Sequence, residues 1–416
     1  MNLKVKIAAL QYFEFLAWGS WLITIGAYCF ATKQWTASQF GIIYSTTGLA
    51  AIFMPAIGGI IADRWINAEK LFGILQFGCA ICMIFVPFVQ TPYALFWLML
   101  VNMCLYMPTI PLVFSISYNV MEQSGMDIIK EYPPLRVFGT LGFASGMWAT
   151  SLLGLETSAM QFYISAIASV LVGIVAFTMP ACPPLGKKVD SSWMSLLGLE
   201  AFKLFKSYKM ATFLIFSILL GICMQLSNAY ADSYIHDFSR LAEYANSPVL
   251  KFPAIIVSLG QCSEMFFVLL VPFFLRRFGI KKIMIMSLVA WVLRWLLLAY
   301  GNPGSGFILI LLSMFVWGMA FDFFNLSGSL YIETQVDPAI RSSAQGLYQV
   351  MVIGIGAAVG SYASGWMIDT FFTVNGVKDW HGIMLAFAAY SLVIAILFLI
   401  FFKHKHDPKE FVNFKH

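Results

Sequence analysis

Residues 307–333 read FILILLSMFVWGMAFDFFNLSGSLYIE, an apolar stretch that ends at Glu333 and carries another carboxylate, Asp322, well inside it. An α-helix rises about 1.5 Å per residue and about 20 residues cross the hydrocarbon core, so this stretch predicts a membrane-spanning helix. A carboxylate at that depth is costly and usually faces a bundle interior or a water-filled cavity. Asp322 is therefore a candidate to bind or relay something. The alternative is a buried Asp that only fixes contacts between helices.

The rest of the chain is similarly apolar. Of its 416 residues, 60% are hydrophobic and only 11% are charged, whereas soluble domains carry roughly 25% charged residues. This composition indicates an integral membrane protein. The seven cysteines are an odd number and nearly all lie in apolar runs, so no disulfide framework is expected. The net charge of +5 is spread over separate loops, which predicts no nucleic-acid partner.

Hydropathy predicts an all-α membrane protein with twelve transmembrane helices. The predicted spans are 7–31, 40–62, 71–90, 93–119, 136–156, 159–180, 211–232, 254–275, 282–300, 307–333, 342–371 and 382–402. Most Lys and Arg residues fall at the termini and in the loops on their side. Only Lys33, Arg240, Lys251 and Lys378 fall on the opposite side. By the positive-inside rule, both termini are expected to be cytoplasmic.

A basic connection divides the chain near its middle. The predicted parts are an N-terminal six-helix half (1–180), a cytoplasmic linker (181–210), a C-terminal six-helix half (211–403) and a cytoplasmic tail (404–416). Within the linker, residues 193–204 predict an amphipathic helix on the inner membrane face.

The two predicted halves echo each other. Pro134-Leu135-Arg136 opens the predicted fifth span, and Pro338-Ala339-Ile340-Arg341 opens the eleventh. Two such halves are typical of transporters built from parallel repeats, which hold their substrate near the midplane. The same two spans carry glycines four residues apart, a spacing that predicts close helix packing: Gly142 with Gly146, and Gly356 with Gly360.

Ionisable and polar side chains at membrane depth are the candidates for chemistry. The ionisable ones are Glu14, Arg136, Glu264, Arg294 and Asp322. Pairs of polar residues three or four apart share a helix face: Arg136 with Thr140, Gln225 with Asn228, and Gln261 with Glu264. Beside aromatic rings such as Phe143 and Phe321, they suit a neutral hydroxylated ligand with a flat ring, and a sugar would also fit. The alternative is hydrogen bonding between helices.

Several classes of site have no counterpart in the sequence. All five histidines lie in loops, at a span end or in the tail, so any proton transfer falls to carboxylates such as Glu264 and Asp322. A P-loop, a zinc-protease motif and a hydrolase nucleophile motif are missing, and we expect no metal, no cofactor and no enzyme activity. Arg294 has no polar neighbours in sequence, which favours a structural salt bridge or snorkelling.

The chain resembles a known family. Its segments 18–22 (WGSWL), 106–109 (YMPT), 133–143 (PPLRVFGTLGF), 278–282 (FGIKK), 321–329 (FDFFNLSGS) and 343–346 (SAQG) are similar to those of the bacterial nucleoside:proton symporters, NupG-type permeases of the major facilitator superfamily. The looser superfamily signature is 58–64 (GGIIADR). The resemblance covers essentially the whole chain.

The resemblance implies a proton-coupled nucleoside importer of the inner membrane that works by alternating access. It implies a nucleoside site at Arg136, Thr140, Phe143, Gln225, Asn228, Gln261, Glu264, Phe321 and Asp322, with Glu264 and Asp322 as proton-coupling candidates. Glu14 departs from the family pattern, in which an uncharged polar residue is expected there. It adds a second titratable site or pairs with Arg136 or Arg294.

Two other functions stay open. One is a permease or facilitator for another neutral hydroxylated solute, such as a sugar, and competition between nucleosides and sugars for uptake would discriminate it. The other is a membrane receptor, which would bind its ligand without transporting it. The expected partners are a nucleoside, protons and the lipid bilayer, and the expected oligomeric state is a monomer.

Overall fold

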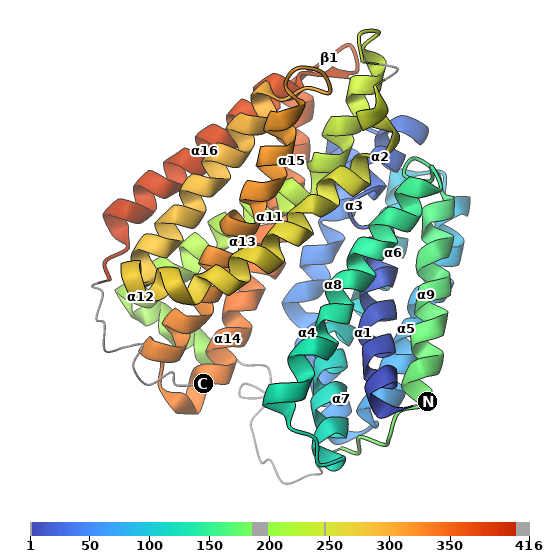
Figure 1. Ribbon diagram of the computed structural model, residues 1–416, viewed down its shortest axis with the longest axis vertical. Coiled ribbons are helices and arrows are strands. Elements are labelled where there is room, and N and C mark those ends of the chain that lie inside the picture. The colour runs from blue at the N-terminus through green and yellow to red at the C-terminus, as the bar shows by residue number, and fades with distance from the viewer. Residues whose placement is uncertain (1, 185–198, 245–246, 405–416) are drawn as a thin grey trace. The chain divides into compact units, whose positions relative to one another are not determined.

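The computed structural model describes residues 2–184, 199–244 and 247–404, and most of them are helical (Figure 1). Two compact units are distinguished by their internal contacts. The first unit comprises residues 1–197 and 228–233, and the second comprises residues 198–227 and 234–416. Helix α11 therefore contributes to both units, because its residues 228–233 group with the first.

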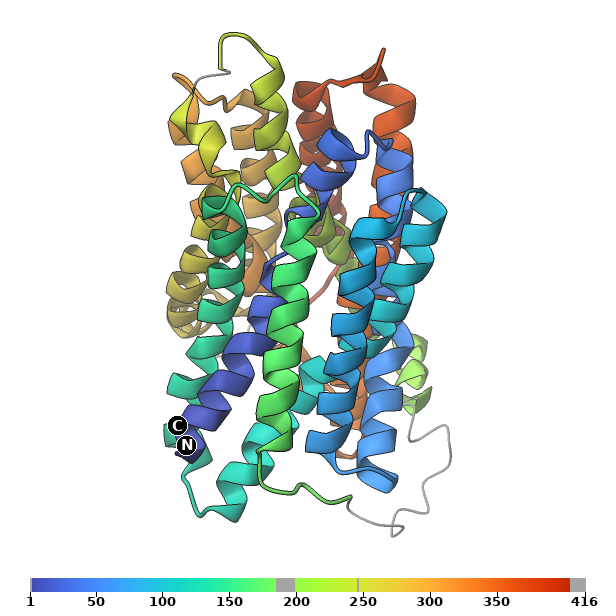
Figure 2. The ribbon, with the colours of Figure 1, turned by 90° about the vertical axis from the view of Figure 1, so that its right-hand side faces the viewer.

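The first unit is a bundle of helices without strands among its described residues. Its elements are α1 Leu3–Gly19, α2 Ile25–Ala27, η1 Tyr28–Thr32, α3 Ala37–Tyr44, α4 Thr46–Arg64, α5 Ala68–Phe85, η2 Val86–Phe88, α6 Pro92–Tyr106, α7 Thr109–Gln123, α8 Ile128–Leu152 and α9 Met160–Phe177. Helix α9 packs against both α1 and α5 and lies between them (Figure 2). Helix α1 also packs along α8, and this contact positions Arg136.

The second unit contains longer helices and one small hairpin. Its elements are η3 Leu199–Lys206, α11 Tyr208–Asp237, η4 Phe238–Arg240, η5 Pro248–Lys251, α12 Pro253–Tyr300, α13 Phe307–Gln335, η6 Pro338–Ile340, α14 Arg341–Gln349, η7 Val350–Gly356, α15 Ala357–Phe371, β1 Thr373–Val374, β2 Val377–Lys378 and α16 Trp380–Phe401. The antiparallel strands β1 and β2 pair Val374 with Val377. They are joined by Asn375 and Gly376, both at positive φ (51° and 77°), which is the backbone that a two-residue Asn-Gly hairpin turn requires.

Nine helical stretches of the described chain are long and apolar enough to cross a membrane: 37–64, 68–88, 92–123, 160–177, 208–240, 253–300, 307–335, 341–371 and 380–401. Each overlaps a predicted span. The 48-residue α12 contains Gly279 at φ 77° and ψ 165°, a non-helical conformation that breaks it between the predicted spans 254–275 and 282–300. Helices α1 and α8 are not among the nine, so the count of twelve stays a prediction.

The helix that contains the predicted fifth span, 136–156, begins before residue 136. Helix α8 begins at Ile128, where the side chain of Asp127 accepts a hydrogen bond from the backbone N–H of Lys130 (3.2 Å). This N-cap satisfies a backbone donor that would otherwise be unpaired, and it starts the helix ahead of both prolines. Arg136 therefore lies two turns inside the helix instead of at its start.

Two other predicted spans are interrupted. The span 7–31 ends as a regular helix at Gly19 and continues through η1, and the span 93–119 divides into α6 and α7 at Pro108, which has no backbone N–H to donate. Residues 193–198 of the predicted amphipathic helix and residues 405–416 of the predicted tail lie outside the described residues. The described end of that predicted helix, in η3, is a tighter 3₁₀ helix instead of an α-helix.

Close helix packing at the predicted glycines is confirmed. A Cβ atom on Gly146 of α8 would lie 2.7 Å from the carbonyl oxygen of Leu16 on α1, so the two backbones touch. In the second unit a Cβ on Gly356 would lie 2.7 Å from the carbonyl oxygen of Ile218 on α11. Any larger side chain would push these helices apart, as expected for small-residue faces in membrane bundles.

Candidate functional site

Helix α8 carries three of the predicted site residues on one face, since Arg136, Thr140 and Phe143 are spaced by four and three residues. The guanidinium of Arg136 lies over two rings, with its Cζ 5.1 Å from the centroid of Phe15 and 5.0 Å from that of Phe114. The negative face of each ring attracts the cation, and each such cation–π interaction contributes about 0.5–2 kcal/mol of stabilising free energy. Arg136 is therefore positioned by aromatic rings of α1 and α7, and these ring contacts do not use its hydrogen-bond donors.

Glu14 on α1 is fully buried in the first unit. Its carboxylate accepts hydrogen bonds from the side-chain amide of Gln76 on α5 and from the hydroxyl of Thr109 on α7, the latter at 2.7 Å. The hydroxyl of Tyr106 donates to the backbone carbonyl of Glu14 at 3.0 Å. The predicted alternative that Glu14 pairs with Arg136 is wrong, because the carboxylate is bonded to an amide of α5 and a hydroxyl of α7.

In the second unit, Asp322 of α13 is buried, with 3% of its surface exposed. Its Oδ2 atom has no hydrogen-bond partner among the described residues. The half-buried Glu264 of α12 is close enough for its charge to act on Asp322. The hydroxyl of Ser263 donates to the carbonyl of Phe315 and ties these two helices together at this level. The two carboxyl groups predicted to couple protons are thus electrostatic neighbours.

An aromatic platform precedes Asp322 on the same helix. The rings of Trp317 and Phe321 lie one turn apart and are stacked, with centroids 5.2 Å apart and planes 3° from parallel. Phe321 is half-buried, whereas the following Phe323 and Phe324 are fully buried in the core. Phe321 is therefore the aromatic residue of this group that has exposed ring surface to offer a flat ligand.

The predicted amide residues have different environments. Gln225 of α11 is 5% exposed and donates from Nε2 to the hydroxyl of Ser361 on α15 at 3.0 Å, which is the interhelical hydrogen bond of the alternative interpretation. Asn228 and Gln261 are half-buried. Asn228 groups with the first unit, together with Arg136, Thr140 and Phe143, and the remaining site residues belong to the second unit.

Arg294 of α12 is buried, with 1% of its surface exposed, so the prediction that it snorkels is wrong. Its Nη1 donates to the carbonyl of Ser313 on α13 (2.8 Å) and its Nη2 to the hydroxyl of Ser227 on α11 (2.8 Å). The Nε atom has no hydrogen-bond partner among the described residues. The predicted salt bridge is also wrong, since a carbonyl, two hydroxyls and the Met314 sulfur hold the guanidinium and lock three helices together.

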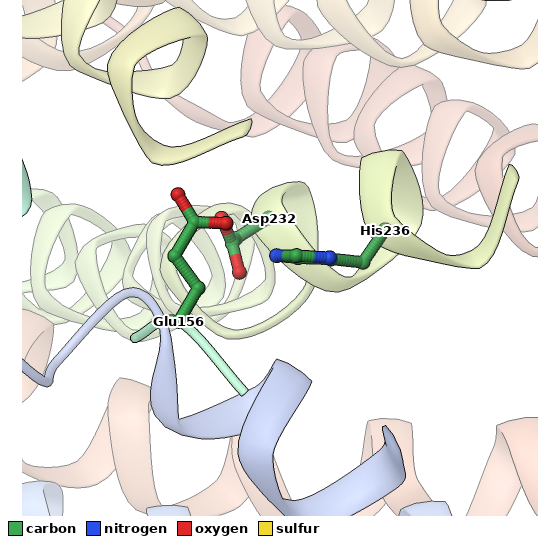
Figure 3. Close-up of side chains that lie close together, drawn as sticks. All are labelled: Glu156, Asp232 and His236. Carbon is green, nitrogen blue, oxygen red and sulfur yellow. The ribbon is translucent and has the colours of Figure 1, made fainter. Parts of the chain in front are cut away.

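Two carboxyl groups that the sequence analysis did not single out lie close together in the first unit. Glu156 and Asp232 are 4% and 0% exposed, and their carboxylate oxygens approach within 4.8 Å (Figure 3). His236 follows Asp232 by one turn on α11 (Figure 3). Glu156 and Asp232 are the last residues of the predicted spans 136–156 and 211–232. Charged residues at the end of a span are ordinarily solvated, so nothing in the sequence singled these two out.

Other contacts were missed for a different reason. Gln76 and Thr109, which hold Glu14, are single polar residues in long apolar runs, and that isolation was a usable signal. Ser227 and Ser313 carry no comparable signal, because serine is common at ordinary helix contacts in membranes.

Comparisons with known proteins extend over the whole chain. A model of the nucleoside H⁺ symporter family matches residues 1–407. The xanthosine permease of Escherichia coli (strain K12) is 47% identical over 411 residues, which are 99% of this chain and 98% of that protein. The nucleoside permease NupG of the same organism is 44% identical over 407 residues, 98% of this chain and 97% of that one. A crystal structure of the nucleoside transporter NupG matches with a TM-score of 0.92, covering 97% of this chain and 100% of the other.

Proposed function

The chain belongs to the nucleoside H⁺ symporter family, and we propose that it imports nucleosides together with protons across the inner membrane. Both bacterial relatives described above are permeases for nucleosides, and they match this chain from end to end. The protein is accordingly a transporter and not an enzyme. No ATP-binding motif is present in the sequence, which agrees with transport driven by an ion gradient.

The observation that carries the proton-coupling part is the buried carboxyl of Asp322 with Glu264 beside it. Two carboxylates whose charges act on each other in a low-dielectric region repel, so the binding of one proton by either of them lowers the free energy of the pair. A proton that enters from one side of the membrane and leaves to the other changes this repulsion at each step. The conformation of α12 and α13 can therefore depend on protonation.

For substrate binding, we infer a site near the midplane to which both halves contribute, used by alternating access. Ribose hydroxyls would bond to the amide and carboxyl groups of Gln261 and Glu264, and the base would stack on the exposed face of Phe321. Arg136 supports this assignment because its aromatic contacts leave its fork of donors available. Phe143, Thr140, Gln225, Asn228 and Asp322 complete the proposed set.

The proposed architecture is the twelve-helix fold of the major facilitator superfamily, with both termini cytoplasmic. The nine long apolar helices become ten when α12 is divided at Gly279, and α1 and α8 bring the count to twelve. We propose the halves as residues 1–180 and 211–403, joined by the linker 181–210 and followed by the tail 404–416. A monomer is sufficient for this mechanism.

The test is uptake of tritiated uridine by proteoliposomes with an interior more alkaline than the exterior. Accumulation above the external concentration that collapses with a protonophore would support nucleoside symport. Equilibration independent of the gradient would make the protein a facilitator. Sugar uptake that nucleosides do not inhibit would favour the other-solute permease, and uridine binding without any uptake would favour a receptor.

A further inference from the structure

A pocket of about 250 Å³ lies in the second unit, and neither Asp322 nor Glu264 is among its lining residues. Its lining residues come from the end of α11, the end of α12, and the segment in which the β1–β2 hairpin leads into α16. Its volume is just below the roughly 300–1,000 Å³ of drug-sized ligand sites. The space therefore fits one small molecule of about a base and a pentose.

Three aromatic rings form a rigid part of its lining. Tyr234 is 2% exposed, and its hydroxyl lies 2.7 Å from the carbonyl oxygen of Leu298 and 2.8 Å from that of Gly301. Its ring packs edge-on against Phe238 (5.1 Å) and Trp380 (5.8 Å). With its hydroxyl bonded at the end of α12, Tyr234 holds the other two rings in place.

Asp237 fixes the polar part of the pocket. One carboxylate oxygen accepts from Trp380 Nε1 (2.8 Å) and the other pairs with Arg240 Nε (2.9 Å). The first bond sets the orientation of the indole, and the second partly neutralises Arg240. A ring with a fixed orientation is a better stacking surface than a mobile one, because less conformational entropy is lost when a ligand binds.

The remaining charges lie on the hairpin side. Lys378 of β2 is partly buried, and desolvation lowers the pKa of its ammonium group while the nearby Asp237 opposes that change. Asp379 caps α16 by accepting from the backbone N–H of Gly382 (3.1 Å). The charged lining residues are Arg240, Lys378, Asp237 and Asp379, two of each sign, and Asp369, which does not line the pocket, also acts on Lys378. This balance favours a neutral ligand with both donors and acceptors over an anion or a cation.

From these contacts we propose that the pocket is a second nucleoside-binding site, separate from the transport site. The base packs against Trp380 and Phe238, and the ribose hydroxyls bond to Lys378 and Asp379. The inference rests on the proposed function, and on the proposed orientation in which this end of the second unit faces the outside. A nucleoside held here is concentrated at the outer surface before it enters the transport pathway.

The test blocks the pocket from two different segments. Val377 of β2 and Leu241 after η4 both line it and are 60% and 51% exposed, so Val377→Trp and Leu241→Trp would fill it without changing the core. Val374→Trp is the matched control, because Val374 is the strand partner of Val377, is 71% exposed and is not a lining residue. Tritiated uridine binding to the purified full chain and uridine uptake by proteoliposomes are measured for each.

We expect the wild type and Val374→Trp to bind two uridines per chain, and each blocking variant to bind one. Stacking of a base on an aromatic ring contributes roughly 5- to 150-fold to affinity, so the weaker site should be lost over the concentrations tested. The KM for uptake should rise in both blocking variants while the maximal rate stays unchanged.

Other outcomes would overturn the proposal. One uridine per chain in the wild type, with an unchanged KM in both blocking variants, would show that the pocket binds no nucleoside. Stronger displacement from the weaker site by uridine 5′-monophosphate than by uridine would show a site for anions. Equal loss of both uridine-binding events in Val377→Trp and Leu241→Trp would show that these two positions are needed for the folded structure and not for a separate site. Absence of uridine uptake by the wild type would instead contradict the proposed function.

Discussion

Replacement of Asp322 by Asn separates proton coupling from folding and substrate binding. The side chain is 3% exposed, and its Oδ2 has no hydrogen-bond partner among the described residues. Asn has nearly the same shape but cannot carry a proton between the two sides of the membrane. The expected result is a folded protein that binds uridine but no longer accumulates it.

The magnitudes follow from this environment. An ionised Asp at the centre of a membrane helix costs about 2.5–3.5 kcal/mol on insertion scales, so the neutral Asn should not lower the thermal stability. A hydrogen bond to a charged group exceeds a neutral one by about 1–1.5 kcal/mol, which limits the loss of uridine affinity to about tenfold. A gradient of about two pH units supplies about 2.7 kcal/mol per proton, enough for about 100-fold accumulation with one proton per uridine. Asp322→Asn should accumulate uridine to a ratio of about 1.

The assay compares wild type, Asp322→Asn and the control Asp337→Asn, which changes an exposed Asp just beyond the same helix. Uridine accumulation, counterflow exchange and the melting temperature are measured for each protein in the same lipid. Exchange should persist in Asp322→Asn, because it requires no net proton movement. Gradient-driven accumulation by Asp322→Asn at the wild-type level would refute Asp322 as the coupling group and leave Glu264 as the candidate.

The remaining predictions concern the other contacts described above. Gly146→Ala should lower the melting temperature by an amount equivalent to about 1–3 kcal/mol, because a Cβ at this position meets the backbone of α1. The control is Gly59→Ala, whose Cβ meets no atom within 4 Å, so the melting temperature should stay unchanged or rise. Equal effects of the two substitutions would contradict the packing argument. Glu14→Gln should retain proton-driven uptake, because the amide can still accept from Thr109, and loss of accumulation with intact exchange would make Glu14 a coupling group. Lys378→Met should raise the melting temperature at neutral pH. The folded-state pKa of Lys378 lies below its ordinary value of 10.5, so between these two pKa values the unfolded chain binds more protons than the folded one. The free energy of unfolding of the wild type should therefore rise with pH over this range. In Lys378→Met that rise should be weaker, and an identical pH dependence of the melting temperature would contradict the lowered pKa of Lys378.

Much of the fold follows from local sequence. Long apolar runs must become helices in a membrane, because each backbone N–H and C=O has to be bonded within its own segment. This reasoning predicted stretches that overlap all nine long apolar helices, and it predicted Gly146 and Gly356 as contact points. It also singled out Asp322, because a charge in an apolar run is visible without any knowledge of its neighbours. The predicted family resemblance is confirmed by the match over residues 1–407.

The partners of the buried polar groups were decided only by the tertiary structure. Glu14 meets Gln76 and Thr109, which are 62 and 95 residues away in sequence, and Arg294 meets Ser227, which is 67 residues away. The sequence shows that such groups need partners, because burying an unpaired charge is costly. It does not show which helix faces supply them. That choice depends on how the helices pack. At Arg294 the packing supplies one carbonyl and two hydroxyls in place of the carboxylate that was predicted.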